Sequence, residues 1–355
     1  QVFASYGGVV LSWVRWSNPQ LVKFKDYYTG MEGMTWNGRE MDRLLLTELE
    51  FPIWEEIAKD VQSRVTDDVI EKAFLRMPKE YYNLSGQEIK RSLKQRRDKL
   101  PSAAAKFYKH LAAEVNVHCT DRDDWVEVQR MDNGDIDVKV SLAMEGKKTG
   151  DTYYRRRFHP KETKEIRIYL HNGNNFVVTS GGRFREIMVR VIGGDDQDQV
   201  DDSKGGGLYF ADVAGKNQLI RGPGSSFDGR IYDPPPPEDP DNTLLEHRDW
   251  GLHTAPQVYP GFSSDIGLFF GGGMISKGYG FRYAPYADSH KILVGYATNA
   301  QSGLFDYWGE FRKPNSSLFS TFSVLVTGLE FLRFYGYGNE TSAGESDDFY
   351  KIRQR

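Results

Sequence analysis

The chain has 355 residues, a formal net charge of −4 and a single cysteine, Cys119. This charge balance gives no reason to expect nucleic acid as a partner, and one cysteine excludes an internal disulfide framework or a cysteine-rich metal cluster. A mean hydropathy of −0.59 and the lack of a long apolar run exclude a transmembrane helix. The chain begins at Gln1, so we expect it to be a processed or excised piece of something longer.

Residues 1–39 form an aromatic N-terminal segment without clear periodicity, and residues 40–116 are predicted to form a helical domain. Ser85 and Glu88 match a capping box, so a helix is expected to start there. A preceding apolar stripe at helical spacing ends before Pro78 and comprises Val69, Ile70, Ala73, Phe74 and Met77. The basic run at 90–99 is either a site for phosphate or lipid headgroups or a solvated helix face. We favour the solvated face because the charges go round the helix.

Residues 117–220 are predicted to form a β domain. Asn133-Gly134 between two alternating runs indicates a hairpin. Beyond it, EIRIYLHNGNN at 165–175 is echoed by EIMVRVIGGDD at 186–196 and more faintly by GLYFADVAGKN at 207–217. The offset is 21 residues both times and aligns Ile166, Ile187 and Leu208.

This period favours a β-solenoid, in which each coil buries its inward residues against the next and glycine admits the tight turns. A meander of hairpins with matching spacing is the alternative. Arg155, Arg156 and Arg157 either bind phosphate groups or protect a strand edge by charge, and the strand edge is the more ordinary explanation.

Residues 221–244 are rich in proline and glycine and are predicted to be a linker, and residues 245–355 to hold the first strands of a β-barrel. Three aromatic-rich runs near twenty residues, at 263–281, 289–311 and 318–337, are expected to be long antiparallel strands. Leu268, Phe270 and Met274 share one face of the first run, while its other face is small or mixed. That second face would line a narrow lumen or pack in a sandwich. Three strands do not close a barrel.

The motifs YGFRYAPY at 279–286, YWGEFR at 307–312 and FYGYGNET at 334–341 resemble the surface-antigen barrels of the outer-membrane assembly-factor superfamily. MTWNGREMD at 34–42 and YRRRFHPKET at 154–163 are similar to segments of large Gram-negative envelope proteins. In those proteins a phosphoesterase or kinase-like domain precedes a helical segment, a β segment and such a barrel. The resemblance implies an α+β, multidomain architecture and an outer-membrane or periplasmic location.

An acidic stretch is the one candidate site, comprising Asp195, Asp196, Asp198 and Asp201. Closely spaced carboxylates after Gly193-Gly194 are typical of calcium-binding turns, because a hard cation needs several oxygens. A solvated acidic turn is the alternative. No catalytic motif for a metalloprotease, hydrolase elbow, phosphate loop or dinucleotide fold occurs, so no catalytic or cofactor-binding residue is assigned.

We therefore expect an outer-membrane-associated protein with a periplasmic domain and a structural, anchoring or transport-assembly role. Its expected partners are outer-membrane lipid and other envelope proteins or further barrel strands, with no nucleic acid. Two alternatives stay open: the non-catalytic part of an envelope enzyme, and a soluble β module that binds glycan or protein.

Overall fold

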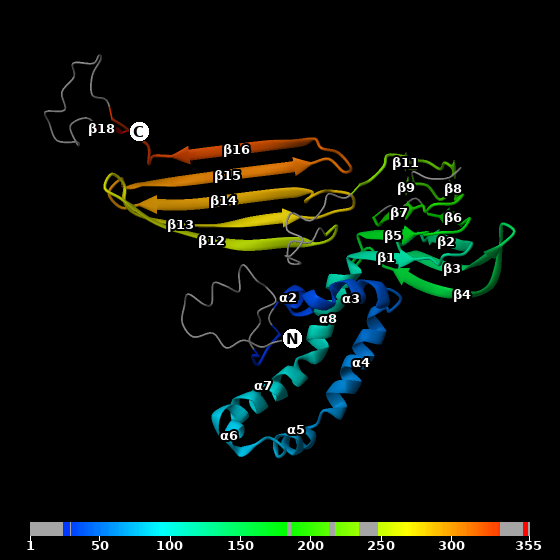
Figure 1. Cartoon of the computed structure of the whole chain (residues 1–355), viewed down its shortest axis with the longest axis horizontal. Helices are drawn as coiled ribbons and strands as arrows, with labels where there is room; N and C mark the ends of the chain where they lie inside the picture. Colours follow the sequence, from blue (N-terminus) through cyan, green and yellow to red (C-terminus); the bar gives the residue numbers. More distant parts are fainter. Residues whose placement is uncertain are drawn as a thin grey trace, which may run out of the picture. The chain divides into compact units, whose positions relative to one another are not determined.

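A computed structural model describes residues 24–28, 30–182, 186–212, 217–233, 248–333 and 351–353. The chain divides into two compact units, residues 1–231 and residues 232–355 (Figure 1). Their boundary falls within the predicted 221–244 linker, although Ser226–Asp228 in that segment is a β-strand of the first unit. The predicted N-terminal segment lies largely outside the described residues, as do residues 234–247. Within the described ranges, no helix has the length and apolar character needed to cross a membrane.

The described part of the first unit has its helices between residues 31 and 112, mostly within the segment expected to be helical. They are α2 (Met31–Thr35), the 3-10 turn η1 (Trp36–Gly38), α3 (Arg39–Leu45), α4 (Phe51–Arg64), α5 (Asp67–Phe74), α6 (Lys79–Tyr81), the π-helical turn η2 (Tyr82–Gly86), α7 (Gln87–Asp98) and α8 (Leu100–Ala112). Thr66 caps α5, since its hydroxyl accepts a hydrogen bond from the Val69 amide.

The predicted capping box at Ser85 is wrong, because Ser85 lies inside η2 and makes no cap hydrogen bond to α7. Helical backbone runs continuously through η2 into α7. Gly86 permits this path, since a Cβ there would lie 2.4 Å from the ring of Tyr82.

The basic run of α7 pairs with the acidic side chains of α5. Lys90 Nζ lies 2.9 Å from Glu71 Oε2, Lys94 Nζ lies 2.9 Å from Glu71 Oε1 and 3.0 Å from Asp67 Oδ2, and Arg97 bonds Asp67 at 2.6 Å. These three cations are therefore engaged within the helical region.

In the described part of the first unit, eleven strands follow the helices in two sheets, with the orders β1-β5-β7-β9-β11 and β10-β8-β6-β2-β3-β4. They are β1 (Glu114–His118), β2 (Asp124–Arg130), β3 (Ile136–Met144), β4 (Lys147–Phe158), β5 (Glu165–Tyr169), β6 (Phe176–Gly181), β7 (Met188–Ile192), β8 (Gln199–Lys204), β9 (Leu208–Ala211), β10 (Gln218–Ile220) and β11 (Ser226–Asp228). The β2–β3 hairpin is confirmed, with Gly134 at φ +88° in its turn. From β5 onward, successive strands alternate between the two sheets and pair in parallel.

The register corrects the predicted repeat. Ile166 lies opposite Val189, and Val189 lies opposite Leu208, so the spacings are 23 and 19 residues where 21 and 21 were expected. Ile187 was therefore wrongly aligned with Ile166. Ile166 and Leu208 keep their expected separation, because the two deviations cancel. The two spacings differ because the turns between the strands differ in length, whereas the pairing keeps the buried apolar residues of neighbouring strands opposite each other.

The core of the first unit lies between these two sheets. Its buried side chains come from both of them and include Val117, Val126, Val138, Ile168, Val177, Val191, Val200 and Phe210. β-branched and aromatic residues at alternate strand positions supply this core.

The second unit is an antiparallel sheet in which neighbouring strands follow each other along the chain (Figure 1). Its strands are β12 (Leu252–Ser263), β13 (Gly267–Gly278), β14 (Asp288–Ala297), β15 (Ser302–Arg312) and β16 (Phe319–Thr327). β17 (Phe331–Arg333) and β18 (Lys351–Arg353) form a separate pair.

The three expected long strands are wrong in number and length. The run 289–311 is a hairpin, β14 and β15, with a turn after Ala297 that places Gln301 at φ +46°. The run 263–281 holds only β13, and β12 was not expected. Residues 318–337 hold β16 and β17, and the remainder lies outside the described residues.

Candidate functional site

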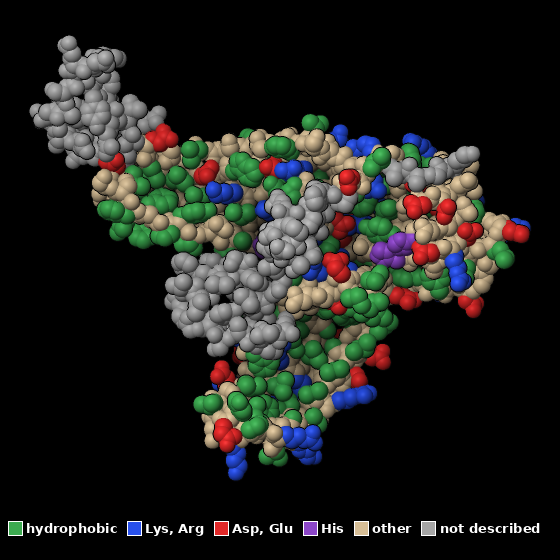
Figure 2. All heavy atoms as spheres, in the orientation of Figure 1, with side chains coloured by type: hydrophobic (Ala, Val, Ile, Leu, Met, Phe, Trp, Pro, Cys, Tyr) green, Lys and Arg blue, Asp and Glu red, His purple; other side chains and the backbone are tan. Residues whose placement is uncertain are grey.

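The sheet of the second unit has one strongly apolar face. The registers place Phe262 opposite Leu268, Met274 opposite Ile292, and Val294 opposite Phe305. Across the strands this face carries Leu252, Pro256, Val258, Pro260, Phe262, Leu268, Phe270, Met274, Ile292, Val294, Tyr296, Phe305, Tyr307, Phe311, Phe322, Val324 and Val326. Figure 2 shows acidic and basic side chains as well as hydrophobic ones over this sheet.

Most of these apolar side chains are exposed, whereas Tyr307 and Val324 are half-buried. Phe262 is 74% exposed, Phe270 62% and Val326 64%, and Val258, Val294 and Tyr296 are also exposed. A contiguous apolar surface of this kind marks contact with a partner or with lipid. Packing within the described part of the second unit does not bury this apolar surface.

The opposite face of the same sheet is mixed: it carries glycines and polar residues together with large apolar side chains such as Phe269, Leu293 and Trp308. The five strands contain six acidic or basic residues in total. Five of the six lie on this second face and are Lys277, Lys291, Asp306, Glu310 and Arg312. Arg312 bonds Glu310 at 2.5 Å. The sixth, Asp288, is the first residue of β14.

A polar row crosses the apolar face near its Asp288 end, with Leu252 and Phe311 beyond it. Thr254, Ser276 and His290 stand side by side on β12, β13 and β14. His290 Nδ1 lies 3.0 Å from the Tyr307 hydroxyl, and its ring meets Phe311 edge-on with centroids 5.3 Å apart. Amphipathic aromatic side chains at the border of an apolar band are typical of a membrane interface.

The carboxylates of the predicted calcium site have separate roles in the first unit. Asp198 is fully buried, and its two oxygens accept hydrogen bonds from the Asn175 amide (3.1 Å) and the Gly194 amide (3.2 Å). Asp196 accepts from the Gly173 amide at 3.0 Å, and Asp201 accepts from the Ser203 amide at 3.0 Å.

Asp195 is exposed and lines a shallow hollow. No three of the His, Cys, Asp and Glu side chains among the described residues are grouped to hold a metal ion. The calcium site stays a prediction. A rise in melting temperature on adding calcium, removed by Asp195→Asn, would support it.

The hollow that Asp195 lines has a volume of about 240 Å³. It also contains Asp121 and His171, and His171 Nε2 lies 3.0 Å from His118 Nδ1. The two rings are inclined by 17°. Burial, and secondarily the charge of His171, lower the pKa of His118. The sequence did not predict this pair, because 53 residues separate its members and only the parallel register brings them together.

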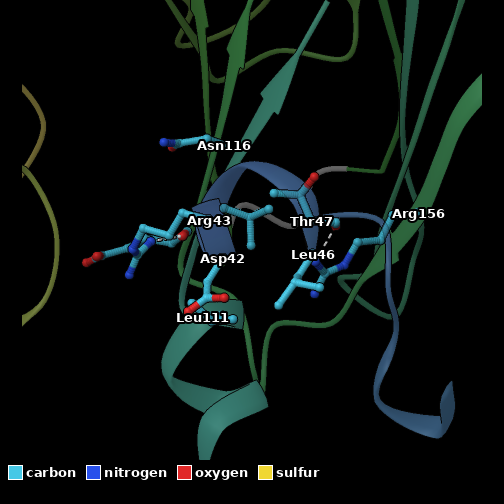
Figure 3. Close-up of a pocket in the computed structure, with 9 residues that line it drawn as sticks. Asp42, Arg43, Leu46, Thr47, Leu111, Asn116 and Arg156 are labelled. Carbon is cyan, nitrogen blue, oxygen red and sulfur yellow. Dashed lines mark hydrogen bonds between the residues drawn. The ribbon is translucent and has the colours of Figure 1, made fainter. Parts of the chain in front are cut away.

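A second, smaller cavity lies where α3 and α8 meet the sheets (Figure 3). Its volume of about 10 Å³ is room for about one water molecule. Arg156 donates to the Thr47 carbonyl at 2.5 Å and Arg43 to the Glu114 carbonyl at 2.9 Å, while burial raises the pKa of Asp42. These arginines join helices to strands, so this cavity is a structural junction.

Two further residues noted in the sequence analysis, Arg157 and Cys119, have structural roles. Arg157 lies on the edge strand β4 and bonds both oxygens of Asp137, at 2.6 and 2.9 Å. Cys119 is buried, and burial raises the pKa of its thiol. The exposed apolar face of β12–β16 is therefore the strongest candidate functional surface among the described residues.

Comparison of the chain with family models, with curated proteins and with solved structures gave no match.

Proposed function

We propose that this protein is associated with a bacterial outer membrane, with the apolar face of β12–β16 in contact with lipid hydrocarbon. The distribution of charge carries the proposal. Five of the six acidic and basic residues of these strands lie on the opposite face, and the sixth stands at a strand end. Lipid-facing strand positions are apolar and lumen-facing ones polar in outer-membrane β proteins.

Strand length supports the same proposal. The five strands have 12, 12, 10, 11 and 9 residues. A strand of about 9–11 residues tilted by about 45° crosses the hydrocarbon layer of a bilayer. Consecutive antiparallel pairing is also the connectivity of such proteins. We propose that these strands are part of a β-barrel, whose closure needs further strands.

For the first unit we propose a two-sided β-solenoid that lies in the periplasm. Alternation of β5 to β11 between two sheets, parallel pairing within each sheet, and stacked buried Val and Ile residues all support it. In this proposal the protein anchors, assembles or passes a partner, and the described residues perform no covalent chemistry.

Fractionation of the native protein tests the proposal. We expect recovery in the outer-membrane fraction, with release by detergent but not by high salt or alkaline carbonate. Intact mass spectrometry of the recovered species then gives its true length. Recovery as a soluble species of 40.6 kDa would overturn the proposal and favour a soluble glycan- or protein-binding module.

A further inference from the structure

Within the strands β12 to β16, Asp288 is the only acidic or basic residue on the apolar face. It shares this face with Ile292 and Val294 of the same strand, and it lies opposite Phe311 of β15. Its side chain is 37% exposed. A carboxylate on a face that contacts lipid costs free energy unless a positive group lies beside it. The position of Asp288 therefore favours a cationic neighbour.

The side chains of His290 and Tyr307 surround one oxygen of this carboxylate. His290 Nε2 lies 3.2 Å from Asp288 Oδ1, and His290 Nδ1 lies 3.0 Å from the Tyr307 hydroxyl. Both nitrogens of the imidazole therefore have polar neighbours within the protein itself. The second carboxylate oxygen, Oδ2, lies over Gly278 of β13, where a Cβ would be 2.6 Å from it. Glycine leaves room there for the carboxylate and for a small group bound to it.

Two hydroxyl groups lie in the next row of the same face. Ser276 lies beside His290, and Thr254 lies beside Ser276. Their hydroxyl oxygens are 3.4 Å apart. This row is two residues from Asp288 along the strands, which is about 7 Å. The two hydroxyls therefore lie within reach of a ligand whose cationic end binds Asp288.

Beyond the hydroxyl row the face is apolar, with Met274 opposite Ile292 and then Val294 opposite Phe305. A ligand that follows the face from Asp288 onward thus meets a carboxylate first, then hydroxyl donors, and then hydrocarbon side chains. A zwitterionic phospholipid carries the matching groups in the same order, namely an ammonium group, a phosphate and acyl chains.

We propose that Asp288, Ser276 and Thr254 form a binding site for the headgroup of a zwitterionic phospholipid. The ammonium group donates to the Asp288 carboxylate, and the two hydroxyls donate to the phosphate. A phospholipid with a net negative headgroup lacks the ammonium group, and Asp288 repels its charge. The site rests on the proposed lipid contact, because the acyl chains lie on the same apolar face.

Competition between two phospholipids tests the site. The native protein in a mild non-ionic detergent is mixed with equal amounts of a phosphatidylethanolamine and a phosphatidylglycerol that have the same acyl chains. Native mass spectrometry counts the bound molecules of each, and we expect phosphatidylethanolamine to be preferred. Asp288→Asn, which removes the charge and keeps the shape, should lower the affinity for phosphatidylethanolamine about tenfold. The matched control is Asp306→Asn, on the opposite face of the sheet, and it should leave the preference unchanged.

A second pair of variants tests the phosphate contact. The double variant Thr254→Ala with Ser276→Ala should weaken the binding of both phospholipids alike, since both carry a phosphate. Thr321→Ala with Ser323→Ala removes two hydroxyls from the opposite face of β16 and should have no effect. Circular dichroism confirms that all variants are folded before their binding is compared.

Three results would overturn the inference: equal binding of the two phospholipids to the wild-type protein, an unchanged preference in Asp288→Asn, or unchanged binding after loss of both hydroxyls. The inference and the proposed function fail separately. An outer-membrane protein without a headgroup preference keeps the lipid contact and loses the site. A soluble protein that still binds phosphatidylethanolamine through Asp288 keeps the site and loses the membrane location.

Discussion

Asn175 and Asp198 are bonded twice across neighbouring turns of the first unit. The backbone amide and the side-chain amide of Asn175 both donate to Asp198 Oδ1, at 3.1 and 3.0 Å. The pattern extends in both directions: the Asp124 amide donates to Asn175 Oδ1 at 3.0 Å, and the Asp198 amide donates to Asn217 Oδ1 at 2.7 Å. The most acidic stretch of the sequence thus contributes to a ladder of polar side chains that satisfies buried turn amides.

Asp198→Ala should lower the free energy of unfolding of the first unit by about 3 kcal/mol. The substitution leaves the buried Asn175 amide and the half-buried Gly194 amide without an acceptor, and losing the acceptor of a buried amide costs about 1–3 kcal/mol. Denaturant unfolding followed by circular dichroism measures the change. Asp195→Ala, at an exposed position, serves as the control and should change stability by less than about 0.5 kcal/mol. Equal effects of the two variants would contradict a structural role for Asp198.

Gly194→Ala should destabilise the first unit by about 2–3 kcal/mol, because a Cβ at this position would lie 1.4 Å from the His171 carbonyl oxygen. Relief of that overlap requires the neighbouring turn to move. Gly38→Ala is the matched control, since its Cβ would meet only the side chain of Asp42, at 3.3 Å. Thermal unfolding of both variants checks the difference. A Gly194→Ala protein as stable as Gly38→Ala would show that the two turns are not so closely packed.

The stability of the first unit should decrease as the pH falls below about 6.5. The pKa of His118 is lowered in the folded protein by burial and by His171, so the unfolded chain takes up its proton first. The unfolded state therefore binds more protons over this range, and acid favours unfolding. His118→Gln should reduce the slope of stability against pH, measured by denaturant unfolding between pH 5 and pH 8. His159→Gln controls for the loss of one histidine, and an equal reduction in that variant would contradict the assignment.

Val294→Lys should remove the protein from the membrane fraction or lower its stability there by about 2–4 kcal/mol, the cost of a lysine near the bilayer midplane. Leu293→Lys, one residue away on the opposite face, should have a much smaller effect. Membrane recovery of each variant after equal expression is the measurement. In a soluble protein the order would reverse, because Val294→Lys would place a charge on a face already in contact with water.

The sequence by itself separated a helical region from the β regions and placed the Asn133-Gly134 hairpin, because these depend on local spacing and turn chemistry. It also predicted the alternation of Leu268, Phe270 and Met274 on one face, since strand side chains have a period of two residues. Its 21-residue repeat equals the mean of the register spacings between β5, β7 and β9. The mean spacing does not specify the register of the strands. The individual spacings of 23 and 19 residues follow from the lengths of the turns between the strands.

Only the tertiary structure decided what the acidic residues do. Asp198 and Asn175 are 23 residues apart, and Asp198 became a backbone acceptor because parallel pairing stacks the two turns. The pairing of His118 with His171 arose in the same way. The division of residues 289–311 into two strands likewise needed the turn at Gln301, whose left-handed φ the residue pattern does not reveal. Contacts between distant segments depend on the register of whole strands, and no local pattern specifies that register.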